Sequence, residues 1–240
     1  MTYSELEMEL FLYDSPAFND FLKDNPHERG EVKFLESIAE EGMDVIDIGA
    51  NIGISSVAIA RKIGGRGKLY SFEPLPQYFD VLKENISSNG LENVEVYKLA
   101  VTEQVGRASF YQKGLSSGIV FEEGAKKFEV PTTNIDRFLS EEKIERIDLI
   151  NMDCEGSELL VLKGAKETLQ KNKVKIFCEI HHDFLKQLGQ SVEDLVQYLQ
   201  ALEFQIHSVS LNDLEVGDNF EKCEYVYARN LNKGRNHAYL

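Results

Sequence analysis

The sequence predicts an α/β fold, a three-layer sandwich in which helices cover both faces of a mostly parallel sheet. Apolar, β-branched runs alternate with helical patterns from residue 43 onward, which is typical of parallel sheets. The first of these runs contains an acid and leads through two glycines into a helix start. With 240 residues, 42% of them hydrophobic, the chain is large enough for one such domain with a sizeable core.

The predicted elements follow one another in a regular order. Strands are expected at residues 44–48, 69–72, 94–100, 147–152, 174–178, 204–209 and 224–228. Helices are expected at residues 54–63, 77–88, 135–139, 157–169 and 192–202. The pair Asn89-Gly90 is expected to end the second of these helices, because glycine adopts the left-handed conformation at little cost.

Some segments stand apart from this alternation. Residues 1–42 have an acidic, helical pattern with a second helix at 32–41, and they predict a lead-in that caps a ligand cleft or covers a sheet edge. Residues 43–230 are predicted to form the main domain, and 231–240 a polar tail. Residues 102–131 predict two short strands around a loop with Gly and Ser. This insertion is expected either to face the substrate, because ligands bind at the carboxyl ends of parallel strands, or to be a surface hairpin.

The turn after the first strand has the composition of a ligand-binding turn. It reads Asp47-Ile-Gly49-Ala-Asn51-Ile-Gly53, and its glycines allow the backbone to approach a ligand that a side chain would exclude. The helix that follows directs its free N–H groups to the same place. About twenty residues further on, Glu73 follows the second strand, where a carboxylate accepts hydrogen bonds from both hydroxyls of a ribose. Together the turn and the acid predict a pocket for a nucleoside cofactor.

The details of this turn narrow the choice of cofactor. The dinucleotide-binding pattern G-x-G-x-x-G has a middle glycine that makes room for a pyrophosphate, and the stretch from Gly49 to Gly53 lacks it. Asp47 would repel a pyrophosphate, whereas its charge suits a sulfonium or an amino group. S-adenosylmethionine is a nucleoside with a cation and no phosphate, so it fits both observations. The alternative is an ordinary strand–helix turn that binds nothing.

Composition and charge weigh against several other classes of protein. The formal net charge is −15 and the basic residues are scattered among acids, so a nucleic-acid substrate is disfavoured. The start of the chain lacks the features of a signal peptide, and no apolar run reaches the length of a membrane span. The three cysteines show no C-x-x-C spacing. Buried free thiols in a reducing, cytoplasmic compartment are therefore expected.

Several motifs occur in a characteristic order. They are the turn at residues 47–53, Phe72-Glu-Pro-Leu-Pro76, residues 85–90, the stretch ending in Asp153-Cys-Glu-Gly-Ser-Glu158, and Glu179-Ile-His181. Together they closely resemble the FkbM-type methyltransferases, S-adenosylmethionine-dependent enzymes whose name-giver O-methylates a hydroxyl in natural-product assembly. The resemblance covers roughly residues 43–182 and makes 43–230 the expected methyltransferase domain. It implies a class I methyltransferase (Rossmann-like) fold, with a seven-stranded sheet whose last strand is antiparallel.

The resemblance also implies which residues bind the cofactor: Asp47, Gly49, Asn51 and Gly53 at the methionine end, and Glu73 at the ribose. Some positions depart from the family pattern. Asn151 stands where the family usually has a lysine, two residues before the acid of the fourth-strand motif, and Asn134 replaces a threonine in a Thr-Thr-Leu-Asp element. Neither departure touches the glycine turn, but Asn151 lies close to the expected catalytic residues.

A group of polar residues follows the fourth and fifth strands, which end side by side at the ligand edge: Asp153, Glu155, Glu179, His181 and His182. One hypothesis is that a carboxylate or His181 acts as the general base for a hydroxyl. The other is that the acids and His181 hold a divalent ion. Base catalysis is favoured, because no tight ligand spacing such as H-x-x-x-H is present. The predicted catalytic residues are Asp153, Glu179 and His181, no metal ligand is assigned, and His182 and Glu158 are each expected to be structural.

These motifs predict O-methylation of a hydroxyl on a sugar, a polyketide or another small-molecule acceptor. The alternatives are methylation of an amine or an RNA base, and a cofactor-binding module without catalysis. An RNA base is disfavoured by the acidity and by the stretch that begins at Asp153, which replaces the Asn/Asp-Pro-Pro-aromatic motif of base methyltransferases. The sequence carries no motif that names the acceptor or specifies an oligomeric state.

Overall fold

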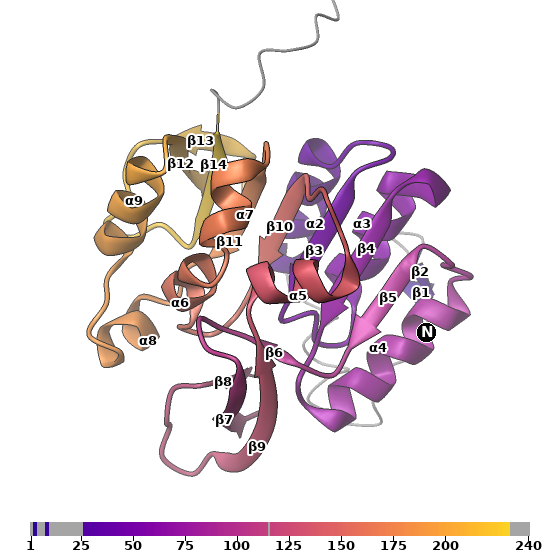
Figure 1. Cartoon of the computed structure of the whole chain (residues 1–240), viewed down its shortest axis with the longest axis horizontal. Coiled ribbons are helices and arrows are strands. Elements are labelled where there is room, and N and C mark those ends of the chain that lie inside the picture. Colours follow the sequence, from indigo (N-terminus) through magenta and orange to yellow (C-terminus); the bar gives the residue numbers. More distant parts are fainter. Residues whose placement is uncertain (1, 4–7, 10–25, 115, 231–240) are drawn as a thin grey trace, which may run out of the picture.

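The computed structural model describes residues 2–3, 8–9, 26–114 and 116–230, and its centre is an eight-stranded sheet (Figure 1). The strands stand in the order β13-β12-β14-β11-β10-β3-β4-β5. In chain order they are β3 (Asp44–Ile48), β4 (Lys68–Phe72), β5 (Val94–Tyr97), β10 (Leu149–Met152), β11 (Lys175–Glu179), β12 (Phe204–Ser210), β13 (Glu215–Gly217) and β14 (Tyr225–Asn230). The strands from β5 to β11 are parallel, and β14 is antiparallel to both of its neighbours. The predicted sheet with an antiparallel last strand is confirmed, and the short edge strand β13 adds an eighth strand to the seven expected.

The two middle strands, β3 and β10, are buried almost throughout. Because helices cover both faces of the sheet, side chains on either face meet apolar neighbours, and this explains the uninterrupted apolar runs. Successive side chains alternate between the faces: Val45 belongs to one hydrophobic cluster and Ile46 to another. Met152 is in register with Ile48. The two strands therefore end level, which places the residues that follow them next to each other.

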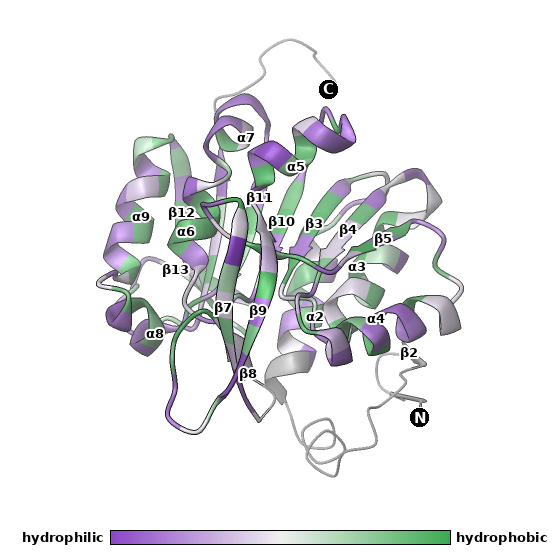
Figure 2. Ribbon diagram, turned by 60° about the horizontal axis from the view of Figure 1, so that its bottom comes forward, coloured by the Kyte–Doolittle hydropathy of each residue, from purple (hydrophilic) through white to green (hydrophobic). Residues whose placement is uncertain are grey.

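The helices divide between the two faces of the sheet. On one face α2 (Pro26–Ile38), α3 (Ile54–Ile63) and α4 (Pro76–Ser88) share hydrophobic clusters, with the 3-10 turn η1 (Gly64–Arg66) after α3. The other face is covered by α5 (Ile135–Glu142), α6 (Glu158–Lys163), α7 (Lys166–Lys171), α8 (His182–Gln187) and α9 (Val192–Ala201). Figure 2 shows hydrophobic residues along the central strands and on the helices that pack against them.

Local sequence signals explain several helix ends. Pro76 begins α4, where a missing N–H costs nothing, and Gly90 beyond its end has a φ of +63°. The predicted helix end at Asn89-Gly90 is thereby confirmed. Ser191 and Asp194 form a reciprocal capping box at the start of α9.

The structure divides two elements that the sequence predicts as continuous. The helix expected at 157–169 is α6 followed by α7, with Gly164 between them so close to Thr102 that a Cβ would lie 2.5 Å from its carbonyl oxygen. The strand expected at 94–100 ends with β5, and Ala100 begins a new strand in a second sheet. In both places a tertiary contact between distant segments interrupts the local pattern. The short elements α8 and β13 are additions to the predicted set.

The insertion forms a separate four-stranded sheet in the order β6-β9-β7-β8. Its strands are β6 (Ala100–Val101), β7 (Gly106–Lys113), β8 (Ser116–Gly118) and β9 (Lys126–Thr133). The two strands predicted in the insertion are present as β7 and β9. In Figure 1 this sheet projects beyond the carboxyl ends of the central strands, which is the edge where ligands bind in such folds.

The lead-in is only partly helical within the described residues. Its helix, expected at 32–41, is α2, and β1 (Thr2–Tyr3) pairs antiparallel with β2 (Met8–Glu9) where the sequence suggests helix. Pairing between these two strands, which the helical spacing did not reveal, decides the conformation of those residues. The tail at 231–240 lies outside the described residues, and the domain division as a whole stays a prediction.

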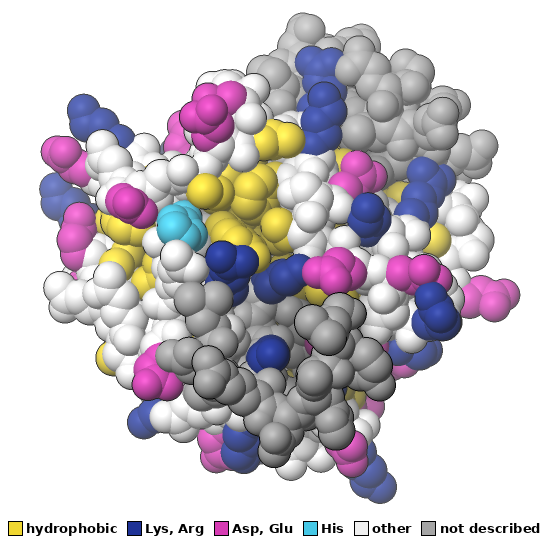
Figure 3. All heavy atoms as spheres, turned by 90° about the horizontal axis from the view of Figure 1, so that it is seen from above, with side chains coloured by type: hydrophobic (Ala, Val, Ile, Leu, Met, Phe, Trp, Pro, Cys, Tyr) yellow, Lys and Arg dark blue, Asp and Glu magenta, His cyan; other side chains and the backbone are white. Residues whose placement is uncertain are grey.

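The thiols and the surface agree with the composition. The three cysteines are buried free thiols, as expected: Cys154, Cys178 and Cys223. Among the described residues, no helix is both long and apolar enough to cross a membrane. Figure 3 shows one face of the molecule, on which Lys and Arg side chains stand beside Asp and Glu rather than forming a basic patch.

Candidate active site

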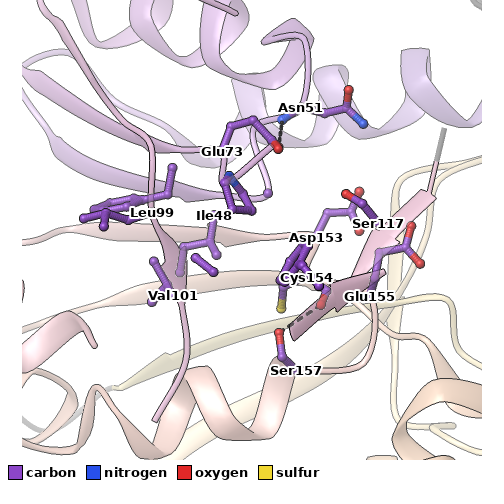
Figure 4. A pocket seen from close by; sticks show the side chains of 15 residues that line it. Ile48, Asn51, Glu73, Leu99, Val101, Ser117, Asp153, Cys154, Glu155 and Ser157 are labelled. Atoms are coloured by element: carbon purple, nitrogen blue, oxygen red, sulfur yellow. Dashed lines mark hydrogen bonds between the residues drawn. The ribbon is translucent and has the colours of Figure 1, made fainter. Parts of the chain in front are cut away.

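A pocket lies at the carboxyl ends of β3, β4 and β10, beside the inserted sheet (Figure 4). The space not filled by atoms in and around it is about 470 Å³, open solvent included. Its walls include residues from each of these segments: Gly49, Asn51, Glu73, Ser117, Asp153 and Glu155. The pocket thus brings residues predicted to bind the cofactor together with a residue predicted to be catalytic.

The two turn glycines are required by neighbouring protein atoms. Gly49 has a φ of +80°, and a Cβ on it would lie 1.7 Å from the carbonyl oxygen of Asp153. The N–H of Asp153 donates to the carbonyl oxygen of Ile48 at 2.9 Å, so the ends of β3 and β10 are in backbone contact. Gly53 has a φ of +93°, and its Cβ would lie 2.6 Å from Cδ1 of Leu82 on α4. Close packing is therefore a second reason for glycine at both positions. Gly49 lines the pocket and Gly53 is not among its lining residues, and the predicted role of both at the cofactor stays a prediction.

Glu73 is placed to accept hydrogen bonds in the pocket wall. Its side chain is 2% exposed, its Oε1 accepts the N–H of Leu75 at 2.8 Å, and its Oε2 accepts the N–H of Asn51 at 3.1 Å. Each oxygen has a second lone pair for a ligand hydroxyl. Burial raises the pKa of Glu73 to about 7, although the two backbone hydrogen bonds lower it. The geometry fits the ribose-binding role that the sequence predicts.

Asn51, whose backbone N–H donates to Glu73, has an unsatisfied side-chain acceptor. Its φ is +49°, and its Oδ1 is buried without a hydrogen-bond partner among the described residues. A buried carbonyl oxygen without a donor costs about 1–3 kcal/mol. A ligand that brings N–H or O–H donors would remove this cost. S-adenosylmethionine carries an ammonium group and two ribose hydroxyls, so the residues of this end of the pocket fit it.

Asp47 lies behind the pocket and is not among the residues of its wall. Its side chain is 1% exposed. Its carboxylate accepts hydrogen bonds from the hydroxyls of Ser55 and Ser56 at the start of α3, and from Asn151 Nδ2 at 2.8 Å. Burial raises the pKa of Asp47, and these hydrogen bonds partly offset the effect. In the structure Asp47 therefore holds β3, α3 and β10 together, and Asn151 takes part in that support.

His181 lies among carboxylates from two strand ends. Its Nδ1 is 2.9 Å from Oε1 of Glu158. Its Nε2 is 3.6 Å from Oε2 of Glu155, 3.7 Å from Oδ1 of Asp153 and 3.8 Å from Oε1 of Glu179. The structure thus brings together the three predicted catalytic residues and adds two further acids to them.

This environment decides the charge of the imidazole. Burial lowers the pKa of His181, but the hydrogen bond to Glu158 and the negative charges of Asp153, Glu155 and Glu179 outweigh burial and raise the pKa to about 10. The imidazole therefore carries an extra proton near neutral pH. Because a protonated imidazole cannot accept a proton, this charge weighs against His181 as the general base, and its predicted catalytic role stays a prediction. A neighbouring carboxylate is the better candidate for the base.

Asp153 is the strongest candidate for the general base among these carboxylates. Burial and the charge of Glu179 raise its pKa well above the ordinary value, although His181 lowers it. Its side chain is 38% exposed, yet its Oδ1 is buried and has no hydrogen-bond partner among the described residues. Burial also raises the pKa of Glu155 and of Glu179. A carboxylate whose pKa is raised toward the working pH is a more effective base.

The same side chains could also hold a divalent ion. Ligand atoms of Asp153, Glu179 and His181 lie within 4.8 Å of one another, and carboxylate oxygens suit Mg²⁺ and Mn²⁺. In the structure these atoms equally form an ion cluster around a protonated imidazole. The metal alternative therefore remains a hypothesis, and base catalysis remains the favoured one.

The remaining polar residues near the site differ in what they contact. Nε2 of His182 is 2.8 Å from the carbonyl oxygen of Cys223, so His182 has the structural role that the sequence favours. Glu158, also expected to be structural, contacts His181 directly. Ser117 of the insertion lines the pocket, although no spacing signal in the sequence identifies it. Only the position of the insertion at the carboxyl ends of the strands pointed to it.

Comparison with known families and proteins agrees with this geometry. The methyltransferase FkbM domain matches residues 47–206. Methyltransferase sdnD of Sordaria araneosa is 31% identical over 51% of this chain and 60% of its own length. The 2-O-methyltransferase NoeI of Sinorhizobium fredii is 30% identical over 54% of this chain and 60% of its own length. The hexuronic acid methyltransferase AglP of Haloferax volcanii is 26% identical over 80% of this chain and 75% of its own length. The matched region thus spans less than two thirds of sdnD and of NoeI.

Solved structures share the fold. An O-methyltransferase from Bacillus cereus in complex with SAH superposes with a TM-score of 0.52 at 14% identity, over 91% of this chain and 92% of that chain. A SAM-dependent methyltransferase from Aquifex aeolicus superposes with a TM-score of 0.50 at 19% identity, over 91% of this chain and 100% of that chain. The class I methyltransferase fold predicted from the sequence is thereby confirmed. With the FkbM domain matched across most of the main sheet, the chain belongs to the FkbM methyltransferase family, as its motifs predict.

Proposed function

We propose that this chain transfers a methyl group from S-adenosylmethionine to a hydroxyl of a small-molecule acceptor, such as a sugar or a polyketide. The observation that carries the proposal is that one pocket joins Glu73 to Asp153, whose Oδ1 is buried and has no hydrogen-bond partner among the described residues. The name of one relative, a 2-O-methyltransferase, supports a hydroxyl as the acceptor group, and the name of another, a hexuronic acid methyltransferase, supports a sugar acceptor.

The cofactor end of the pocket is formed by the turn after β3 and the end of β4. Glu73 would accept hydrogen bonds from the ribose hydroxyls, and Asn51 would offer its Oδ1, which has no hydrogen-bond partner in the described part of the chain, to a donor of the same ligand. Gly49 keeps this turn against Asp153, so the cofactor and the base are held at a fixed separation. When bound, S-adenosylmethionine supplies a methyl group already activated by its positive sulfur.

The acceptor end is formed by the residues after β10 and by β8. Asp153 would take the proton of the acceptor hydroxyl while the oxygen lone pair forms the bond to the methyl carbon and the carbon–sulfur electrons pass to sulfur. His181, protonated and 3.7 Å from Asp153, holds a positive charge beside the acid. Ser117 and Gly118 of β8 cover this end: a Cβ on Gly118 would lie 2.7 Å from the carbonyl oxygen of Glu155. This contact supports the substrate-facing interpretation of the insertion.

The proposal is tested by mass spectrometry with four kinds of acceptor: neutral hexosides, phenolic polyketides, amines and an RNA oligonucleotide. The expected result is a methylated hydroxyl product together with S-adenosylhomocysteine. Methylation restricted to the amine or the RNA would refute O-methylation, and cofactor binding without turnover on any acceptor would favour the non-catalytic alternative.

The base is tested with Asp153→Asn, which keeps the shape of the side chain. Turnover should fall by about 10²–10⁴-fold with cofactor affinity nearly unchanged. Asp183→Asn, the same change at an exposed position on α8, is the matched control. Full activity of Asp153→Asn would move the base to another residue.

The proposal includes a cytoplasmic location. The three buried free thiols support a reducing compartment.

A further inference from the structure

Glu158 is the least accessible acid at the active site. It begins α6 and is 0% exposed. Its Oε1 accepts the N–H of Gly156 at 3.0 Å and lies 2.9 Å from Nδ1 of His181, while its Oε2 has no partner among the described residues. Burying a carboxylate is unfavourable unless the charge is paired and hydrogen-bonded. The imidazole provides that pairing, which gives Glu158 a direct connection to the site.

The ring of His181 is hydrogen-bonded along one edge. Its Nδ1 is within hydrogen-bond distance of Glu158, whereas its Nε2 is 3.6–3.8 Å from the acids around the pocket, which is too long for a direct bond. A carboxylate only accepts hydrogen bonds, so Nδ1 carries the hydrogen. Nε2 is then left to face Asp153, Glu155 and Glu179.

The same oxygen of Glu158 also connects two segments of the chain. Glu155 and Gly156 both have positive φ values, of 49° and 97°, in the turn that follows β10. The hydrogen bond from Gly156 to Glu158 supports this turn, and the contact with His181 reaches the residues that follow β11. Glu158 therefore relates the position of the imidazole to the positions of the acids in the pocket wall.

We propose that Glu158 is a positioning residue that fixes the orientation of the His181 ring, so that Nε2 faces Asp153, Glu155 and Glu179, and that keeps the hydrogen on Nδ1 when the ring is neutral. The catalytic consequence of this inference rests on the proposed function, but the orientation of the ring does not. A ring held in this way keeps a positive charge at a constant distance from Asp153 while that acid takes a proton. Without Glu158 the ring could turn about its side-chain bonds and take the charge away from the pocket.

The orientation is tested by nitrogen-15 NMR of the full chain. The signals of His181 are assigned by their loss in His181→Asn. In the wild type, Nδ1 should stay protonated across the titration. In Glu158→Gln, which keeps the shape but loses the charge, the midpoint should move to lower pH by about one pH unit or more, and the Nδ1 signature should weaken. Glu167→Gln, the same change in a side chain that is 68% exposed, should leave His181 unchanged. Identical His181 signals and midpoint in Glu158→Gln and the wild type would overturn the inference.

A second variant covers the case in which Glu158→Gln does not fold, which circular dichroism would reveal. Glu158→Asp keeps the charge but shortens the side chain, so the contact with Nδ1 should lengthen and the midpoint of His181 should again move to lower pH. An unchanged midpoint in this variant would also overturn the inference.

Kinetics separate positioning from a purely structural role. Glu158→Gln should lower kcat, leave the KM for S-adenosylmethionine nearly unchanged and shift the pH–rate profile in the direction of the His181 midpoint. In a His181→Asn background, adding Glu158→Gln should cause little further loss. A full further loss would show that Glu158 does not act through the ring. If the wild type transfers no methyl group, the proposed function fails while the NMR measurements still decide the role of Glu158.

Discussion

Replacing Gly49 with alanine tests the contact that holds the two halves of the site together. Two effects of the new Cβ add to each other. The residue has a φ of +80°, and an L-residue pays about 1–2 kcal/mol in that conformation. The Cβ would also lie 1.7 Å from the carbonyl oxygen of Asp153, so the backbones of β3 and β10 must separate by more than about 1 Å. Overpacking of this kind costs about 1–3 kcal/mol, and the total expected loss is about 2–5 kcal/mol.

The loss is measured as the free energy of unfolding in urea, followed by circular dichroism and extrapolated to water. Gly90→Ala is the matched control, because Gly90 has a similar φ of +63° but no atom within 4 Å of its Cβ position. It should lose only the conformational part, about 1–2 kcal/mol. The difference between the two variants then measures the cost of the clash with Asp153.

Equal destabilisation of Gly49→Ala and Gly90→Ala would refute the reasoning, because it would mean that the strand ends separate at no cost. In a folded Gly49→Ala variant, we also expect weaker cofactor binding and lower turnover, since the turn and Asp153 move apart. Calorimetry with S-adenosylmethionine checks the first of these effects and the methyltransferase assay the second.

Further predictions concern the cofactor, pH and metal. Glu73→Ala should weaken the binding of S-adenosylmethionine by about 1–3 kcal/mol in calorimetry, and an unchanged affinity would exclude Glu73 from the site. Nicotinamide dinucleotides should not bind to the wild type at all. Because burial raises the pKa of Glu73 to about 7, the folded state binds its proton more tightly than the unfolded chain, so the contribution of Glu73 to stability is fully present below about pH 4.5 and is lost as the pH rises to about 7. The loss should be about 3 kcal/mol, read as the difference between the wild type and Glu73→Gln in urea unfolding at both ends of this range; parallel curves would contradict it. Methyl transfer should survive a chelator. Abolition by EDTA with recovery in Mg²⁺ or Mn²⁺, together with similar losses in Asp153→Ala and Glu179→Ala, would instead establish the metal hypothesis.

The sequence by itself determined the parallel core, because that information is local. Apolar runs with period two and helical stretches with period 3.6 depend only on near neighbours in the chain, and both middle strands, β3 and β10, are where these patterns place them. The ordered motifs likewise indicated the family and the place of Glu73 at the end of β4 in the pocket wall, since each motif is a short stretch whose turn or strand end follows from its own residues.

Only the tertiary structure decided how these motifs act on one another. Gly49 and Asp153 are 104 residues apart in the sequence, and no spacing rule reveals that a Cβ between them would collide. Asp47 belongs to the predicted binding turn, yet its carboxylate points to Asn151 and to the serines of α3. Which side of a strand end a side chain takes depends on the neighbouring strand, and so does the division of the helix expected at 157–169.

The charge of His181 is the clearest case. The sequence places one histidine near several acids, and that pattern agrees both with a neutral base and with a protonated partner of the acids. Distances and burial choose between them: Glu158 at 2.9 Å and three further carboxylates at 3.6–3.8 Å keep the proton on the imidazole. Electrostatic energies depend on separation and on exclusion of water, and both quantities exist only once strands distant in the sequence lie side by side.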